Sequence, residues 1–161
     1  MRFGIGYDIH RLEPATGGSI PLGGVAIPCP FQIVAHSDGD VILHSLTDAI
    51  LGSLALGDIG QWFSDKDPKN KGRNSFDFLD AALAEIGKLG WEVAQVDLNV
   101  FAETPKVAPH AETIRKRLSV ALGLPMNAVS LKAKTMEGLG AIGAKQAIAS
   151  QALVSVREKA E

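Results

Sequence analysis

The sequence has little cysteine, no long apolar run and no excess of charge of either sign. Cys29 is the only cysteine, so no disulfide can form within the chain, and a reducing compartment is its simplest location. No stretch reaches the roughly 20 apolar residues of a membrane-spanning helix. Residues 1–6 lack the apolar run of a secretory signal. We therefore expect a cytoplasmic protein with no membrane partner.

Basic residues are not in excess. Lys and Arg number 16 against 18 Asp and Glu, which gives a formal charge of −2 at pH 7. A general nucleic-acid-binding protein usually carries a basic stripe, so we expect no nucleic-acid partner. Local cations must bind any anionic ligand, because the overall charge does not attract one.

The composition that remains is that of an ordinary globular protein. Hydrophobic residues make up 46% and charged residues 21% of the 161 positions. This length suits one domain with a substantial core, so we expect a single domain over residues 1–161.

Helical and extended patterns alternate along the chain. The expected helices span 40–54, 75–89 and 109–122, and Ser75 is a candidate cap of the second helix. The expected strands span 2–10, 92–103, 129–135 and 147–156. This order indicates an α/β (α+β) two-layer sandwich, in which a mixed β-sheet carries three main helices on one face. The apolar last strand fits burial either in the core or in a subunit interface.

Three residues in the first third of the chain form a candidate metal site. Residues two apart on a strand point to the same side, so Asp8 and His10 can converge on one ion. His44 can supply a third ligand from the helix expected at 40–54. Two imidazoles and a carboxylate are typical of zinc, whose fourth position would stay open to a ligand oxygen. The alternative is a helix start with a capping Asp and a solvated His.

The surroundings of His44 suggest how that helix begins. Gly39 permits a tight turn, and Ser37 or Asp38 is expected to cap the helix. Asp48 lies one turn beyond His44, where it either holds the second imidazole nitrogen or faces solvent.

Further segments have more than one interpretation. Residues 61–74 are charged and read as a solvated loop, although 63–67 are also candidates for a lid over a charged ligand. His110 reads as a packing or capping residue. Residues 138–143 match G-x-G-x-x-G, but no acidic residue follows at the distance that a dinucleotide site requires. We therefore expect a flexible loop there.

The motifs taken together resemble the 2-C-methyl-D-erythritol 2,4-cyclodiphosphate synthase family over essentially the whole chain. They are Asp8-Ile9-His10, then residues 36–40, 44–48, 57–60, 102–106 and 132–137. The resemblance implies the substrate 4-diphosphocytidyl-2-C-methyl-D-erythritol 2-phosphate, in the non-mevalonate isoprenoid pathway. Its 2-phosphate attacks its own β-phosphate, which releases CMP and leaves a cyclic diphosphate. The resemblance also implies a homotrimer whose active sites are shared between neighbouring subunits.

Site residues follow from the same resemblance. Zn²⁺ or another divalent transition metal is assigned to Asp8, His10 and His44, and Mg²⁺ or Mn²⁺ with the substrate diphosphate to Glu137. By sequence alone, Glu137 is only an acidic residue before a glycine loop. His36 and Thr135 correspond to transition-state stabilisers.

The implied substrate contacts fall into two groups. The metal and erythritol group comprises Asp8, Ile9, His10, His36, Ser37, Asp58, Ile59, Gly60, Phe63, Ser64, Asp65, Lys66 and Asp67. The cytidine and phosphate group comprises Ala102, Pro105, Lys106, Val107, Ala108, Ala133, Lys134, Thr135, Met136 and Glu137. Without the resemblance, the 102–108 segment reads as a loop that joins a strand to a helix.

The chain departs from the family pattern at a few positions. Ala141 stands where relatives often have an aromatic residue, and Ala144 where they have an arginine. This puts binding of an isoprenoid diphosphate on the trimer axis in doubt, although Lys145 is a candidate to compensate. Lys134 replaces a threonine and adds a cation.

Two other functions are compatible with the same three candidate metal ligands. The same triad with an open site could activate water in a zinc-dependent phosphohydrolase. A trimeric binding protein with structural zinc would instead need a fourth protein ligand, Asp40 or His36.

Overall fold

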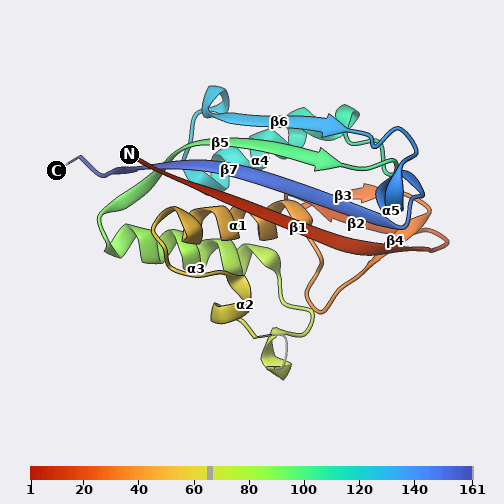
Figure 1. Ribbon diagram of the computed structural model, residues 1–161, viewed down its shortest axis with the longest axis horizontal. Coiled ribbons are helices and arrows are strands. Elements are labelled where there is room, and N and C mark those ends of the chain that lie inside the picture. Colours follow the sequence, from red (N-terminus) through yellow and green to blue (C-terminus); the bar gives the residue numbers. More distant parts are fainter. Residues whose placement is uncertain (65–66, 161) are drawn as a thin grey trace.

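The computed structural model describes residues 1–64 and 67–160, which form a five-stranded mixed sheet and a separate hairpin (Figure 1). The sheet strands are β1 (Arg2–Pro14), β4 (Phe31–Val34), β5 (Trp91–Phe101), β6 (Val129–Lys134) and β7 (Ala147–Glu158), in the order β4-β1-β7-β5-β6. β5 and β6 run parallel, and the other pairs are antiparallel. The hairpin joins β2 (Ser19–Leu22) to β3 (Val25–Pro28).

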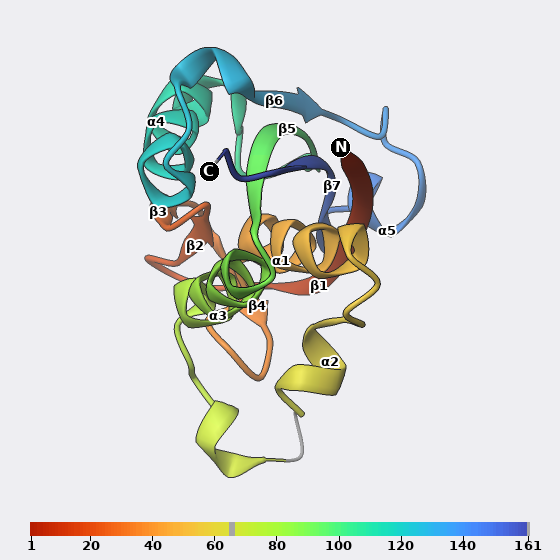
Figure 2. The same ribbon diagram turned by 90° about the vertical axis from the view of Figure 1, so that its left-hand side faces the viewer.

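The longer helices of the described chain lie on one side of this sheet (Figure 2). They are α1 (Val41–Ser53), α3 (Ser75–Lys88) and α4 (Ala111–Leu122). The short helices are α2 (Ile59–Trp62) and α5 (Gly140–Gly143), and the 3₁₀ turns are η1 (Pro68–Asn70), η2 (Ala108–His110) and η3 (Met126–Ala128). The predicted fold class is confirmed. No helix within the described residues is long and apolar enough to cross a membrane.

The predicted caps of two helices are wrong. Asp40, not Ser37 or Asp38, caps α1, since its carboxylate accepts hydrogen bonds from the amides of Ile42 and Leu43. Asn74 caps α3, so Ser75 is its first residue.

Two segments expected to be loops contain helical turns. Within the expected loop 61–74 lie the end of α2 and η1, and the glycine-rich segment 138–143 contains α5. α5 has only 4 residues, and β7 after it pairs antiparallel with both its neighbours, so the segment is not the turn of a parallel dinucleotide-binding unit.

The inner face of β1 brings the first helix unusually close to the sheet. Gly4 and Gly6 lie on that face and are buried. A Cβ atom on Gly4 would lie 1.9 Å from the carbonyl oxygen of Ala49, and one on Gly6 would lie 2.0 Å from that of Ser45. Only glycine permits this approach, and α1 is consequently buried on nearly all sides.

The opposite face of the sheet is apolar and largely uncovered. Phe3, Ile5, Tyr7 and Ile9 alternate along β1 and are 46–64% exposed, and Leu153 of β7 lies opposite Ile5. The alternate residues of β7 that face the helices are buried in the core. β7 is therefore the central core strand, while its outer side contributes to an exposed apolar face.

Candidate metal centre

The structure brings Asp8, His10 and His44 together as the sequence predicted. The Asp8 Oδ2 atom lies 3.0 Å from His10 Nε2 and 2.9 Å from His44 Nδ1, and the two nitrogens are 3.2 Å apart. Ligand atoms on a tetrahedral zinc lie about 3.3 Å apart, given bonds of about 2.0–2.1 Å. The three side chains are only 12–23% exposed. Their donor atoms and spacing therefore fit one divalent metal ion.

The position of these ligands follows from the packing of α1 on β1. Asp8 and His10 continue the inner face of β1 that begins with Gly4 and Gly6. Because the glycines let α1 lie against the strand backbone, His44 in the first turns of the helix reaches both strand ligands.

The triad also determines the charge of Asp8. Burial on its own would raise the pKa of this carboxyl group. Hydrogen bonds from His10 and His44, with their charges, outweigh that effect and hold the pKa well below its ordinary value. Asp8 is therefore an anionic ligand at neutral pH.

The predicted contact between Asp48 and His44 is not formed. Asp48 Oδ1 instead accepts a hydrogen bond from the Ile59 amide at 2.8 Å, which joins α1 to the start of α2. The second ring nitrogen of His44, Nε2, lies 2.8 Å from Ser75 Oγ and 3.1 Å from Ser37 Oγ. The sequence does not predict Ser75 as a neighbour of His44, because 31 positions separate the two residues and no local pattern joins them.

A closed, all-protein metal shell does not form in the described chain. Both oxygens of Asp40 are occupied by backbone amides, those of Gly23 and Gly24 among them, and the side chain is fully buried. Among the described residues, no other His, Cys, Asp or Glu joins the triad. The arrangement leaves room for a ligand atom from outside, as a catalytic site requires.

A cavity of about 310 Å³ opens beside the triad, and we call it the triad pocket. It is lined by His10, Val34, Ala35, His36, Ser37, His44, Ile59, Gly60, Phe63, Asn70 and Phe78. The predicted site residues His36, Ser37, Ile59, Gly60 and Phe63 thus share one cavity with two of the metal ligands.

The remaining residues predicted on this side lie around α2 and η1. Asp58 caps α2 through the Gln61 amide, and Asp67 caps η1 through the Lys69 amide. Phe63 packs on Phe78 with ring centroids 4.8 Å apart. Ser64 precedes the undescribed pair, and the predicted Asp65 and Lys66 lie outside the described residues.

The other predicted residues form a second group, residues 102–108 and 133–137, which we call the distal cluster. The Ala102 amide donates to the carbonyl of Lys134 at 2.9 Å, and the Met136 amide donates to Glu103 Oε1 at 2.9 Å. Thr135 Oγ1 donates to Glu137 Oε1 at 3.0 Å. The cluster therefore holds the two segments together, with Pro105 and Val107 buried and Lys106, Ala108 and Ala133 exposed.

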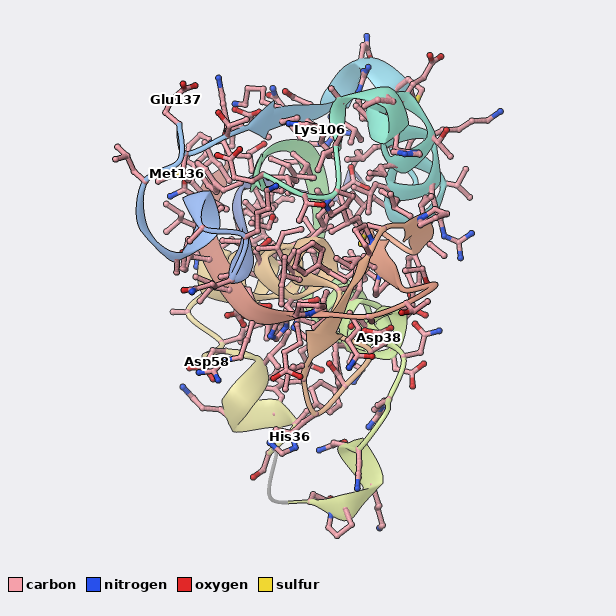
Figure 3. All side chains as sticks on the ribbon, turned by 90° about the vertical axis from the view of Figure 1, so that its right-hand side faces the viewer. His36, Asp38, Asp58, Lys106, Met136 and Glu137 are labelled. Carbon is pink, nitrogen blue, oxygen red and sulfur yellow. The ribbon has the colours of Figure 1, made fainter. Side chains whose placement is uncertain are left out.

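The two groups lie apart on opposite sides of the molecule in Figure 3. Lys106, Met136 and Glu137 lie in the upper half of that view, whereas His36 and Asp58 lie in the lower half. Glu137 does not join the triad group. One chain therefore does not bring all the predicted site residues into a single cavity.

Comparison with known proteins gives consistent results. The model of the YgbB family matches residues 1–157. A curated relative from Pseudomonas paraeruginosa, 2-C-methyl-D-erythritol 2,4-cyclodiphosphate synthase, is 48% identical over 153 residues, which cover 95% of this chain and 96% of the relative.

Solved structures share both fold and sequence with this chain. The Plasmodium falciparum IspF in complex with CDP superposes with a TM-score of 0.86 at 39% identity, covering 99% of this chain and 97% of that one. The bifunctional IspDF of Campylobacter jejuni has a TM-score of 0.92 at 36% identity. That match covers 98% of this chain but only 42% of the longer bifunctional chain.

Proposed function

The chain belongs to the YgbB family, and we propose that it acts as a 2-C-methyl-D-erythritol 2,4-cyclodiphosphate synthase of the non-mevalonate pathway. Its substrate is then 4-diphosphocytidyl-2-C-methyl-D-erythritol 2-phosphate, and its products are the cyclic diphosphate and CMP. The observation that carries this proposal is the triad of Asp8, His10 and His44 beside the triad pocket, a cavity of about 310 Å³.

The reaction needs positioning more than a strong base. A phosphate monoester has a second pKa near ~6, so the attacking 2-phosphate is already largely dianionic at neutral pH. The main barrier is the approach of two anions, and fixed cations and hydrogen-bond donors lower it. His36 and Ser37 line the triad pocket and are positioned to donate hydrogen bonds to phosphate oxygens.

We assign Zn²⁺ to the triad and Mg²⁺ or Mn²⁺ to Glu137 and the diphosphate. A bound divalent ion supplies charge that polarises a phosphate oxygen. Asp58, Ile59 and Gly60 would hold the erythritol hydroxyls, and the described residues Phe63, Ser64 and Asp67 would cover them. Asp58 is exposed beside the triad pocket, which suits contact with a polar ligand.

The distal cluster is our candidate for the cytidine half of the site. The exposed side chain of Lys106 can bind a phosphate, and the hydroxyl of Thr135 can donate a hydrogen bond to the phosphoryl group that is transferred. Backbone groups of 102–108 can read the cytosine edge. The CDP complex of the Plasmodium falciparum relative supports a cytidine nucleotide as ligand.

Because the two halves of the site lie apart within one subunit, we propose that neighbouring subunits of a homotrimer complete each site. The outer face of the sheet supports this assembly. Phe3, Ile5 and Tyr7 of β1 and Leu153 of β7 expose apolar side chains in one patch that suits contact between subunits.

Product analysis tests the proposed reaction against hydrolysis. The purified protein is incubated with the cytidylated substrate and Mg²⁺, and the products are separated by chromatography. We expect CMP and cyclic diphosphate without inorganic phosphate; a zinc-dependent phosphohydrolase would release inorganic phosphate. His44→Ala should abolish turnover and leave a folded oligomer, and substantial residual activity would contradict the metal role.

A further inference from the structure

The imidazole of His44 is held from both ring nitrogens. Nδ1 faces the triad, 2.9 Å from Asp8 Oδ2. Nε2 points away from it and lies 2.8 Å from the hydroxyl of Ser75, the first residue of α3. Ser75 is fully buried, so water does not compete for this contact.

Ser75 in turn contacts the carboxylate of Asp38. Its hydroxyl hydrogen-bonds to Asp38 Oδ1, and its amide donates to Asp38 Oδ2 at 2.9 Å. The three residues come from three segments: the loop before α1, α1 itself and the start of α3. They form a continuous chain, Asp38–Ser75–His44, that ends at the triad.

The chemistry of the three groups determines which atom donates and which accepts in each of these hydrogen bonds. An ionised carboxylate only accepts hydrogen bonds, and a serine hydroxyl has one proton to donate. The Ser75 proton therefore points to Asp38, and a lone pair of its oxygen faces His44. A metal-bound imidazole keeps only one ring proton, so His44 would then carry it on Nε2, and the Nδ1 lone pair would be free for the ion.

We propose that Ser75 and Asp38 are positioning residues that fix the tautomer and orientation of His44 as a metal ligand. This inference rests on the proposed metal site. Partners behind metal-bound histidines commonly take this role, usually through direct contact with a carboxylate or a carbonyl. Here the buried Ser75 lies between the carboxylate of Asp38 and the imidazole of His44 and hydrogen-bonds to both.

Ser37 does not replace Ser75 in this role. Its hydroxyl lies 3.1 Å from His44 Nε2 and accepts a hydrogen bond from the Gly39 amide at 3.2 Å. No hydrogen bond between Ser37 and a carboxylate is found among the described residues. Because His44 Nε2 has only one proton and Ser75 is the closer acceptor, the Ser37 proton is available to a ligand in the triad pocket.

Metal affinity measured without substrate tests the inference. Metal-free protein is titrated with Co²⁺ in competition with a chromophoric chelator, and the visible spectrum of the bound ion reports its coordination. We expect Ser75→Ala to weaken Co²⁺ binding about 10–100-fold and to alter the spectrum. Asp38→Asn should also weaken binding. Both carboxylate oxygens of Asp38 accept hydrogen bonds from Ser75, so the NH₂ group of asparagine must replace one acceptor and break that hydrogen bond. The double variant should lose little more than the worse single variant, because the two residues act in one chain.

The matched control is Ser45→Ala on α1. Ser45 is also fully buried and donates a hydrogen bond to Ser150 Oγ at 2.9 Å. It should lower the melting temperature but keep the Co²⁺ affinity within about twofold, because it has no contact with an imidazole ring nitrogen in the described structure.

The outcomes separate the inference from the function it rests on. Ser75→Ala with wild-type affinity and spectrum would overturn the inference, provided His44→Ala abolishes binding. Larger losses in Ser37→Ala than in Ser75→Ala would also overturn it. Wild-type protein that binds no Co²⁺ would overturn the metal site itself. A purely structural Ser75 would lower the melting temperature and leave affinity and spectrum unchanged.

Discussion

Gly6→Ala should disturb the metal site although Gly6 is not one of its ligands. The added Cβ would lie 2.0 Å from the carbonyl oxygen of Ser45 and 2.8 Å from the amide nitrogen of Ala49. An ordinary contact begins at 3.4 Å, so α1 and β1 must separate by more than an ångström. Both contacts are to backbone atoms, so no side-chain rotation can relieve them.

This separation acts directly on the triad, because two ligands lie on β1 and one on α1. Metal–ligand distances tolerate changes of only about 0.2 Å. We therefore expect Co²⁺ or Zn²⁺ affinity to fall at least about tenfold. Overpacking of this kind costs about 1–3 kcal/mol, and each kcal/mol lowers the melting temperature of a chain of this size by about 2–4 °C.

Gly52→Ala is the matched control. Gly52 lies on α1, the helix that packs on Gly6. Its added Cβ would be 3.9 Å from the carbonyl oxygen of Ile5, which is an ordinary contact. Alanine is favoured over glycine inside a helix by about 1 kcal/mol, so Gly52→Ala should match or exceed wild-type stability and keep metal affinity. Chelator competition and thermal unfolding measure both effects. Wild-type metal affinity in Gly6→Ala would refute the argument that close packing of α1 builds the site.

Three further predictions concern the outer sheet face and the distal cluster. Ile5→Asp places a charge on the exposed apolar face, so light scattering should show monomers in place of the proposed trimers, with loss of turnover. Lys106→Ala should weaken CMP binding about tenfold in calorimetry, because a hydrogen bond to a charged group is lost. The hydrogen bond from Lys132 lowers the pKa of Asp97 despite its partial burial, so this pair stabilises the fold above the ordinary pKa and the effect is lost as pH falls through the lowered one. Asp97→Asn should therefore lose less stability than wild type as the pH falls below the ordinary pKa of an aspartate, about 4, measured by urea unfolding.

Controls for these predictions come from other exposed positions. Val120→Asp on α4 adds the same charge away from the sheet, so it should leave the oligomer intact. Lys116→Ala should not change CMP affinity, and Asp80→Asn should retain the acid sensitivity of wild type. Unchanged oligomer mass in Ile5→Asp, unchanged CMP affinity in Lys106→Ala or unchanged acid sensitivity in Asp97→Asn would contradict the respective prediction.

The sequence alone determined which residues could act together locally. The period of two along a strand placed Asp8 and His10 on one side, and helical spacing placed His44 on a helix of the correct extent. Motif order was sufficient to indicate the family, and the alternation of elements indicated the layered fold. These features depend on spacing along the chain, which a sequence displays directly.

Only the tertiary structure decided which faces meet. Gly4 and Gly6 fall in a predicted strand, but their contact with the backbone of α1 depends on how the two elements pack. Ser75 follows His44 by 31 positions, so no local pattern connects the two. Asp40 rather than Asp38 caps α1, because the hairpin amides of Gly23 and Gly24 surround its carboxylate. The separation of Glu137 from the triad likewise depends on how distant segments pack, because spacing along the chain sets the side a residue faces but not the partner it meets.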